Sequence, residues 1–533
     1  MAARLPLYTD DLSGLDGWDR AVRRWEEESL VEKLWASDPS VWGTAAPAAG
    51  DWLGWLDLPY TMGEQLGDMV CLADQAASEG LADVVLLGMG GSSLAPEVFG
   101  AVFGSGPGRP RLTVLDSTHP EAVTSLRSRI DLSRTLFLVS SKSGTTVETL
   151  SFYRFFWEQC SGEGARFLAI TDQGTPLDRL ARERGFRAVF NAPAFVGGRF
   201  SALSAFGLVP AALIGVDLEP LLERAQESAD RGRLGIAENP AVGLGLAMGV
   251  AAVAGMDKLT LLTTESLAAF PAWMEQLVAE SLGKNGVGIV PVAGESILPG
   301  GLYGSDRIFL VWESEGGPPV GLPGDLSGAR IEVGDRLDLG AEIIRAELAV
   351  AAAGEVLGVN PFDQPDVEEA KRLASEAMGR DAATAGTDLA PAQSTGARAS
   401  IRKMVENLGP GDYLGIQAYL PPGAEIEEKI SGVRRRITEI SGAATTFGYG
   451  PRYLHSTGQV HKGGPPGGVF LQLVDDPRSE VQVPETGFGF SRLIAAQAEG
   501  DYLALRGAGR RVLRVNLGSD RSGGLDAIAE SLI

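Results

Sequence analysis

The chain has 533 residues, of which 44% are hydrophobic and 22% charged, and its formal net charge is −23. This length exceeds the roughly 250–300 residues at which one hydrophobic core stops growing, so two or three domains are expected. The acidic balance disfavours broad binding to nucleic acid or anionic membranes, because both need clustered Lys and Arg. Only Cys71 and Cys160 are present, which excludes a disulfide framework and a four-cysteine zinc site.

The N-terminal residues lack the apolar core of a signal peptide, and no uninterrupted apolar run reaches about 18 residues. We therefore expect a cytoplasmic location. Residues 1–80 are rich in Trp and are predicted to be mainly helical. Short apolar runs then alternate with helical patterns, which indicates a doubly wound parallel sheet that binds ligands at the carboxyl ends of its strands. The predicted strands are 83–87, 111–115, 135–139 and 166–170.

A second unit of this kind is predicted to begin near Pro240, with strands at 258–262, 288–292 and 307–311 and helices at 267–284 and 340–354. The stretch 380–400 is rich in Ala, Thr, Gly, Pro and Ser without periodicity, which is typical of a linker. A third unit follows, with strands near 413–419, 469–474 and 512–516. The predicted division is a first unit 1–239, a second unit 240–380, a linker 381–400 and a C-terminal α/β unit 401–533.

A Gly-rich loop follows the first predicted strand, where residues 88–96 read Gly-Met-Gly-Gly-Ser-Ser-Leu-Ala-Pro. Glycines allow a sharp turn and a close approach to a ligand, and Ser92 and Ser93 offer hydroxyls at the start of a helix. The spacing matches neither the dinucleotide-binding fingerprint nor a Walker A loop. Taken alone, the loop is explained equally well as a tight strand-to-helix turn with a serine cap.

A hydroxyl-rich segment follows the third strand, where residues 140–149 read Ser-Ser-Lys-Ser-Gly-Thr-Thr-Val-Glu-Thr. It gathers hydroxyls and one ammonium at a helix N-terminus, whose free N–H groups suit a phosphate dianion. The alternative is a capping box from Thr145 to Glu148. Because Ser92 lies in the neighbouring loop of the same sheet, we favour phosphate binding. The candidate substrate-binding residues of the two loops are Gly91, Ser92, Ser141, Lys142, Ser143, Thr145 and Thr146.

These two loops are the first of five motifs that, in order, resemble those of the phosphoglucose isomerase family, which has the sugar isomerase (SIS) fold. Residues 196–204 look like the family's Gly-Gly-Arg-Tyr-Ser motif, 276–284 like its Gln-x-x-x-Glu-Ser-Asn-Gly-Lys helix, and 360–371 like its Asn-Pro-Phe-Asp-Gln-Pro-Gly-Val-Glu-x-x-Lys motif. The resemblance covers about residues 80–375 and implies two SIS-type doubly wound domains, here with a smaller C-terminal α/β domain. That extra domain resembles the C-terminal unit of bacterial isomerases fused to transaldolase, although no transaldolase segment is visible.

The resemblance implies that Glu280 is the base that moves a proton between neighbouring sugar carbons through a cis-enediol, a role that typically contributes 10²–10⁴-fold in rate. Gln276 lies one turn earlier on the same helix face, where it can hold the substrate. Arg199 matches the arginine that stabilises the enediolate charge. The alternatives are a solvated helix surface for Glu280 and Gln276 and a structural ion pair for Arg199. Leu282 stands where the family usually has Asn, which leaves the support of Glu280 open.

Lys371 matches the family lysine implicated in ring opening, and the alternative is a surface lysine. The family's ring-opening histidine is missing, because no histidine occurs between His119 and His455. We hypothesise that His455 or His461, in the Gly-rich loop 453–464, supplies this group from the same chain or a partner subunit. A solvated loop is one alternative; a metal site is weaker, since no Cys or carboxylate pattern accompanies the histidines. His119, between a strand and a proline, is better explained by turn chemistry.

These inferences predict an aldose–ketose isomerase that interconverts glucose 6-phosphate and fructose 6-phosphate, a step of glycolysis and gluconeogenesis. One alternative is a dual phosphoglucose/phosphomannose isomerase. A non-catalytic sugar-phosphate sensor is another, disfavoured because no basic helix-turn-helix segment is visible and the catalytic set would be idle. We expect no metal or organic cofactor, no nucleic-acid or membrane partner and, from the resemblance, a homodimer.

Overall fold

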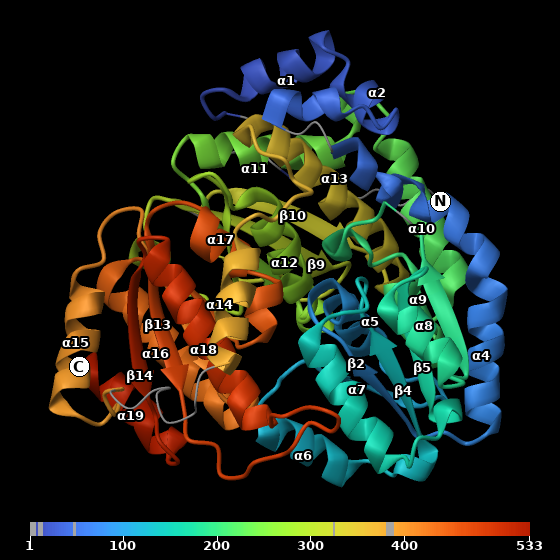
Figure 1. Cartoon of the computed structure of the whole chain (residues 1–533). Coiled ribbons are helices and arrows are strands. Elements are labelled where there is room, and N and C mark those ends of the chain that lie inside the picture. The colour runs from blue at the N-terminus through green and yellow to red at the C-terminus, as the bar shows by residue number, and fades with distance from the viewer. Residues whose placement is uncertain (1–6, 9–13, 46–48, 194, 323–325, 380–388) are drawn as a thin grey trace.

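The computed structural model describes residues 7–8, 14–45, 49–193, 195–322, 326–379 and 389–533. Its named strands form two five-stranded sheets and one four-stranded sheet, and every pairing between them is parallel except that of β1 with β10. Helices cover the sheets, as Figure 1 shows. This arrangement confirms the predicted fold class of two doubly wound domains with a smaller C-terminal α/β domain.

The first sheet has the order β3-β2-β4-β5-β6, so the chain reverses its direction of strand addition between β2 and β4. All four predicted strands are present, and β6 is an addition whose half-buried residues gave no continuous apolar run. The strands are β2 (Asp83–Leu87), β3 (Arg111–Leu115), β4 (Thr135–Ser140), β5 (Phe167–Asp172) and β6 (Ala188–Ala192). The helices around them are α4 (Leu66–Ser78), α5 (Leu94–Phe103), α6 (Pro120–Arg129), α7 (Val147–Gln159), α8 (Pro176–Glu183) and α9 (Ala205–Leu213).

The second sheet has the order β1-β10-β9-β7-β8. Its strands are β1 (Leu7–Tyr8), β7 (Lys258–Thr263), β8 (Val290–Ala293), β9 (Arg307–Ser314) and β10 (Gly328–Val333). Its helices are α10 (Leu218–Arg231), α11 (Pro240–Val253), α12 (Phe270–Leu282) and α13 (Leu339–Leu357). The predicted helix at 267–284 is α12, and the predicted helix at 340–354 is α13, which is buried along nearly its whole length.

The N-terminal segment packs on the second unit instead of the first. Helices α1 (Trp18–Glu27) and α2 (Leu30–Trp35) lie over α11 and α13 at the top of Figure 1. The indole of Trp25 donates to the Glu355 carboxylate at 2.8 Å, and that of Trp42 donates to the Ala351 carbonyl at 2.9 Å. Because β1 also pairs with β10, the predicted first unit 1–239 is not one structural body.

The C-terminal sheet has the order β12-β11-β13-β14. The predicted linker 381–400 is partly wrong, because Thr395 begins a helix that Ser394 caps and that buries Ala397 and Ile401; residues 380–388 lie outside the described part of the chain. The strands are β11 (Tyr413–Tyr419), β12 (Ala444–Tyr449), β13 (Gly468–Val474) and β14 (Arg511–Asn516). The helices are α15 (Thr395–Glu406), α16 (Ala424–Ser441), α17 (Gly458–Gly463), α18 (Phe490–Gly507) and α19 (Arg521–Ser531).

Helix α14 (Val367–Gly379), which carries the Lys motif, packs along α18 of the C-terminal unit. At their crossing, a Cβ added to Gly500 would lie 2.5 Å from the backbone nitrogen of Ala374, so only glycine permits this close approach. Helix α14, which precedes the predicted boundary at residue 380, therefore packs closely against the unit that follows this boundary.

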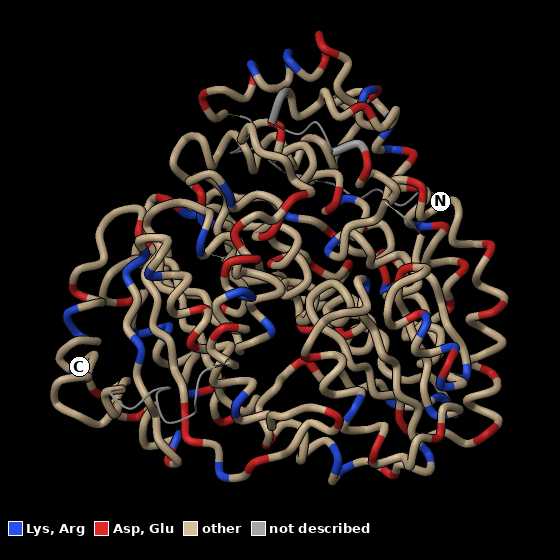
Figure 2. The backbone as a smooth tube through the Cα atoms, in the orientation of Figure 1, with Lys and Arg blue, Asp and Glu red and all other residues tan. Residues whose placement is uncertain are grey.

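Charged residues of both signs are interspersed along the backbone, as Figure 2 shows. Within the described ranges, no helix combines the length and apolarity that crossing a membrane requires.

Glu347, in the middle of α13, is a buried ionisable group. Its side chain is 1% exposed and Oε1 has no hydrogen-bond partner among the described residues, so burial raises its pKa well above the ordinary value. The unfolded chain ionises this group near pH 4.3, so folding stability should fall as pH rises, by about 1.4 kcal/mol per unit until the folded-state pKa is reached. Glu347→Gln should therefore raise the melting temperature at pH 7 and flatten its pH dependence.

Melting temperatures of wild type and Glu347→Gln across about pH 5–8 test this, with the exposed Glu223→Gln on α10 as the control. Parallel pH dependences for wild type and Glu347→Gln would contradict the prediction.

Candidate active site

The Gly-rich loop after β2 packs directly on the Gly-Gly-Arg segment. A Cβ added to Gly91 would lie 2.0 Å from the carbonyl oxygen of Gly198, so this contact requires glycine. Arg199 follows at once in the 3-10 helix η8 (Gly198–Phe200). The loop thus joins two motifs that are about 100 residues apart in the sequence, and Ser92 is buried within it.

The hydroxyl-rich segment after β4 does not form the capping box. Helix α7 begins at Val147 and its N-cap, Thr146, makes no capping hydrogen bond through its side chain. The Ser141 hydroxyl lies 2.9 Å from that of Thr146, and the Ser143 hydroxyl lies 2.9 Å from that of Thr145. The start of α7 therefore presents paired hydroxyls, and the carboxylate that would complete a capping box turns elsewhere.

Lys142 lies apart from these hydroxyls. Its ammonium forms an ion pair with Asp172 and lies 5.8 Å from the centroid of a Trp52 ring. Lys142 is not among the residues that line the cavity described next.

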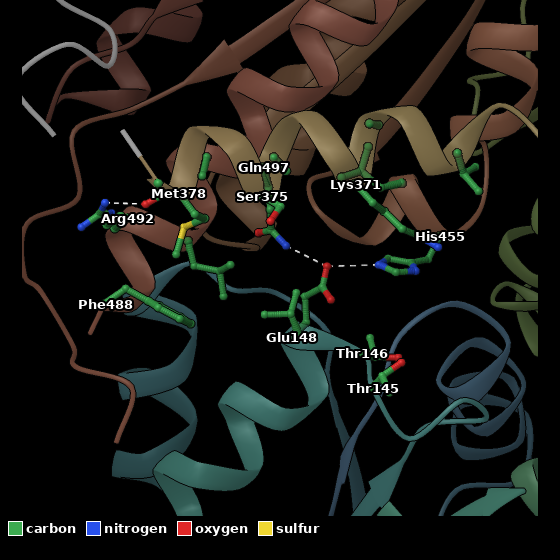
Figure 3. A pocket seen from close by; sticks show the side chains of 18 of the residues that line it. Thr145, Thr146, Glu148, Lys371, Ser375, Met378, His455, Phe488, Arg492 and Gln497 are labelled. Carbon is green, nitrogen blue, oxygen red and sulfur yellow. Dashed lines mark hydrogen bonds and ion pairs between the residues drawn. The ribbon is translucent and has the colours of Figure 1, made fainter. Parts of the chain in front are cut away.

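A cavity of about 710 Å³ lies between the start of α7, helix α14 and the C-terminal unit. Figure 3 shows α14 and α18 on one side of it and the start of α7 on the other. One part of the wall is apolar, with Met378, Phe488 and Leu493. The polar part includes Ser143, Thr145, Thr146, Glu148, Lys371 and His455. The predicted phosphate loop, the ring-opening lysine and one candidate histidine thus share one cavity.

Glu280 lies deeper, on α12, where Arg199 contacts it. Arg199 Nη1 is 3.2 Å from Glu280 Oε2, and its Nε donates to the Ser281 hydroxyl at 2.8 Å. Burial raises the pKa of Glu280 above its ordinary value, although Arg199 and the Gln276 amide oppose this. The Arg199 and Glu280 side chains are 5% and 8% exposed, which excludes the alternative of a solvated helix surface for Glu280. The ion pair given as the alternative for Arg199 is present.

The Asn-Pro-Phe segment closes around these two residues. Arg199 Nη2 donates to the carbonyl of Pro361 at 2.7 Å, and Lys284 Nζ donates to the carbonyls of Asn360 and Asp363, each at 2.6 Å. Burial lowers the pKa of Lys284 to about 8. Three motifs predicted from separate parts of the chain therefore form one buried polar cluster.

His455 comes to this cluster from the C-terminal unit of the same chain. Gln276 donates to the His455 carbonyl at 2.8 Å, and a Cβ added to Gly90 would lie 2.7 Å from that oxygen. The imidazole Nε2 lies 3.1 Å from Glu148 Oε1 (Figure 3). Burial alone would raise the pKa of Glu148, but His455, a backbone N–H group and Lys371 together hold the pKa below its ordinary value. His455 therefore links the cavity to the α12 face that carries Glu280.

Glu280 itself is not among the residues that line the cavity, although its side chain retains 8% exposure. Glu280 is linked to this cavity through Gln276, one turn earlier on α12, whose side-chain amide donates to the backbone carbonyl of the cavity-lining His455. Lys371 does line the cavity; its side chain is 52% exposed and forms an ion pair with Glu368 at 2.7 Å.

His461 is not brought to the cavity. It is 3% exposed, its Nδ1 lies 3.3 Å from the Gln417 amide, and its ring centroid is 4.8 Å from that of Phe470. Burial lowers its pKa well below the ordinary value, so it is a neutral histidine of the C-terminal core. His119 caps α6, as turn chemistry suggests, and its Nε2 also lies 3.2 Å from Asp475 of the C-terminal unit.

Many of the lining residues were not predicted as site residues from the sequence, among them Glu148, Lys462 and Gln497. Glu148 was considered only as half of a capping box, whereas its carboxylate accepts from the Gln497 amide at 2.7 Å. Lys462 forms an ion pair with the fully buried Asp501 at 2.5 Å. No sequence motif marks Gln497, and Lys462 has only its position beside His461 as a signal. In the described ranges, no group of three or more His, Cys, Asp or Glu is placed to hold a metal ion.

Known proteins are similar to this chain in sequence and in fold. A glucose-6-phosphate isomerase from Rubrobacter xylanophilus is 31% identical over 388 residues, which is 61% of this chain and 89% of that protein. A crystal structure of a hypothetical protein from Thermus thermophilus matches with a TM-score of 0.60 and 27% identity, over 70% of this chain and 100% of that one. A glucose-6-phosphate isomerase structure from Chlamydia trachomatis, with a TM-score of 0.58 and 20% identity over 68% of this chain and 86% of that one, shares the fold.

The family model for phosphoglucose isomerase matches residues 72–293, a range that includes both hydroxyl-bearing loops, Arg199 and Glu280. The C-terminal unit with His455 lies outside this match. Together with the relative from Rubrobacter, the match shows that this chain belongs to the phosphoglucose isomerase family and is an enzyme that isomerises a sugar phosphate.

Proposed function

We propose that this enzyme interconverts glucose 6-phosphate and fructose 6-phosphate through a cis-enediol, with Glu280 as the base. The observation that carries the proposal is the contact between the buried Glu280 carboxylate and the Arg199 guanidinium, 3.2 Å apart. A carboxylate of raised pKa is a stronger proton acceptor when ionised, and an adjacent fixed cation stabilises the negative charge that develops on the enediolate.

The phosphate is bound at the start of α7. Ser143, Thr145 and Thr146 line the cavity there, and the unpaired N–H groups of the helix N-terminus favour a dianion. With the phosphate at this end, the first two sugar carbons extend toward the α12 face, where Gln276 and Glu280 lie one turn apart.

Ring opening must come first, because the cyclic form hides the carbonyl. With Glu148 ionised and accepting from Nε2–H of His455, the other ring nitrogen, Nδ1, takes the proton of the C1 hydroxyl. The C1–O5 bond breaks as C1=O forms, and the Lys371 ammonium protonates the ring oxygen. Both groups line the cavity, which supports their assignment to this step.

Isomerisation follows on the open chain. Glu280 removes the proton from C2, the C1=C2 double bond forms, and the charge that moves onto O1 is stabilised by Arg199. The same carboxyl then returns the proton to C1 while the proton of the C2 hydroxyl passes to O1, so that C2 becomes the ketone and C1 carries a hydroxyl. One base serves both carbons because they are adjacent.

Turnover assays with glucose 6-phosphate, fructose 6-phosphate and mannose 6-phosphate test this function. We expect reversible conversion of the first two and none of the third. Turnover of mannose 6-phosphate would indicate the dual isomerase. Turnover of none of them would overturn the substrate assignment.

A substrate that needs no ring opening separates the two chemical steps. The sugar 5-deoxyfructose 6-phosphate lacks O5 and carries its phosphate on O6, so it cannot close a ring onto C2. Entry of deuterium from D2O at its C1 therefore reports proton transfer alone. A homodimeric state, a cytoplasmic location and kinship with transaldolase-fused isomerases remain predictions from the sequence.

A further inference from the structure

An arginine three residues before His455 fastens its loop to the first unit. Arg452 and His455 are the first and last residues of the 3-10 helix η14 (Arg452–His455), in which side chains three apart lie on the same side. Arg452 Nη1 lies 3.1 Å from a carboxylate oxygen of Glu97 and 3.1 Å from one of Asp116, and Nη2 contacts the second oxygen of Glu97. Glu97 lies in α5 and Asp116 directly follows β3, so both acids belong to the first unit.

A second set of contacts reaches His455 from the other direction. Two residues after Asp116, the Thr118 hydroxyl donates to Gln497 Oε1 at 2.7 Å. The amide of Gln497 donates to Glu148 at 2.7 Å, and Glu148 lies 3.1 Å from the His455 imidazole. Together with the short chain segments 116–118 and 452–455, these contacts close a ring that runs through Arg452, Asp116, Thr118, Gln497, Glu148 and His455.

This ring crosses between the first unit and the C-terminal unit at four contacts, namely Arg452 with Asp116, Thr118 with Gln497, Glu148 with Gln497 and Glu148 with His455. Glu148 of the first unit thus holds the imidazole, and the ion pairs of Arg452 hold the loop that carries it. The residues that close the ring are buried or partly buried, which limits screening by solvent.

We propose that Arg452 is a positioning residue for ring opening: through Glu97 and Asp116 it sets the loop so that His455 meets Glu148 and the sugar at once. This rests on the proposed function, in which His455 acts on the C1 hydroxyl. A misplacement of about 1 Å is enough to cost up to 10²-fold in rate, so loss of the guanidinium acts on kcat for the cyclic substrate.

Arg521 provides a matched control. Its guanidinium joins the same two units through Glu121, at 2.8 Å, and through Asp475, but it lies on α19 and outside the ring. Arg521→Met therefore removes a comparable contact between units without touching the loop of His455. If Arg452→Met acted only by weakening the docking of the first unit on the C-terminal unit, Arg521→Met would show the same loss of activity.

The test compares Arg452→Met, Arg452→Lys and Arg521→Met. We expect Arg452→Met to lower kcat for glucose 6-phosphate by about 10- to 100-fold with a nearly unchanged KM, and to keep deuterium exchange into 5-deoxyfructose 6-phosphate. Arg452→Lys should recover much of the loss, because it keeps one charge between the two acids. Arg521→Met should retain kcat on both substrates.

The proposal is overturned if Arg452→Met keeps its kcat, if Arg521→Met loses as much, or if exchange on the acyclic substrate falls as far as turnover of the cyclic one. Glu97→Gln, which removes the same ion pair from the first unit, provides the comparison if Arg452→Met does not fold. It should show a smaller loss of the same kind, and a wild-type kcat would overturn the proposal. If wild type does not turn over glucose 6-phosphate, the proposed function itself fails.

Discussion

Glu280→Gln should lower kcat for glucose 6-phosphate by about 10²–10⁴-fold, with much less effect on KM. The amide keeps the shape of the side chain and can still face Arg199, but it cannot take the proton from C2. Deuterium exchange into 5-deoxyfructose 6-phosphate should fall to the same extent, because this carboxyl serves proton transfer on open and cyclic substrates alike. Steady-state assays and NMR detection of deuterium at C1 measure the two quantities.

The pH dependence gives a second measurement on the same group. The base must be ionised, and burial raises its pKa, so kcat/KM of wild type should fall on the acid side at a pH above the ordinary pKa of a glutamate. Glu280→Gln should lack this acid limb.

Glu275→Gln is the matched control for both measurements. Glu275 precedes Gln276 on the same helix but lines a separate cavity with Arg434, and burial raises its pKa to about 7. Arg452 also lines that cavity. We expect Glu275→Gln to keep wild-type kcat within about 3-fold, because it leaves intact the contact of Glu280 with Arg199 and the ion pairs of Arg452 with Glu97 and Asp116. Full activity of Glu280→Gln would end the assignment of the base.

His455→Ala should separate ring opening from proton transfer. Turnover of glucose 6-phosphate should fall by about 10²-fold or more, because each molecule must then wait for spontaneous opening of its ring. Exchange on 5-deoxyfructose 6-phosphate should remain close to that of wild type. An equal loss on both substrates would contradict the assignment of His455 to ring opening, and so would an unchanged turnover of glucose 6-phosphate.

His461→Ala is the companion variant. Since His461 is packed among Tyr453, Phe470 and Gln417 and lines no part of the substrate cavity, its loss should lower the melting temperature and leave kcat largely intact below that temperature. The sequence places both histidines in one Gly-rich loop and does not distinguish them. This pair of variants tests whether their roles differ.

In the proposed reaction the extra unit supplies the histidine for ring opening, because His119, the histidine within the region that matches the family model, caps α6 and contacts Asp475 instead. The loop after β12 carries His455 and Arg452, and the segment after β13 carries Asp475 and Phe488; both follow the carboxyl ends of strands in the C-terminal sheet. Ligands bind at this edge in open α/β sheets, and here the edge faces the cavity and the first unit. The proposed site therefore uses residues that follow the carboxyl ends of strands in two sheets of one chain, that of the first unit and that of the C-terminal unit.

Local sequence patterns determined most of the elements. The apolar runs at 83–87 and 135–139 are strands because continuous burial on both faces selects them, and the glycines after β2 end the strand in a turn that only glycine permits. The motifs around Arg199, Glu280 and Lys371 were identifiable because each lies within about twelve residues of sequence. Strand β6 was missed because its mostly half-buried residues give weak periodicity. The start of α15 was missed because its Thr-, Gly-, Ala- and Ser-rich composition is typical of a linker.

Tertiary structure alone decided which of these segments meet. Contacts such as Glu148 with His455 join residues more than 300 positions apart, and the turn of Lys142 toward Asp172 depends on neighbouring strands of one sheet. Tertiary contacts likewise decided that His461 is buried and that α14 packs against α18, where Gly500 allows the close approach. The sequence by itself determined which chemical groups the protein possesses and the local elements that carry them. Packing decided which groups share a cavity, because burial and distance depend on all the units together.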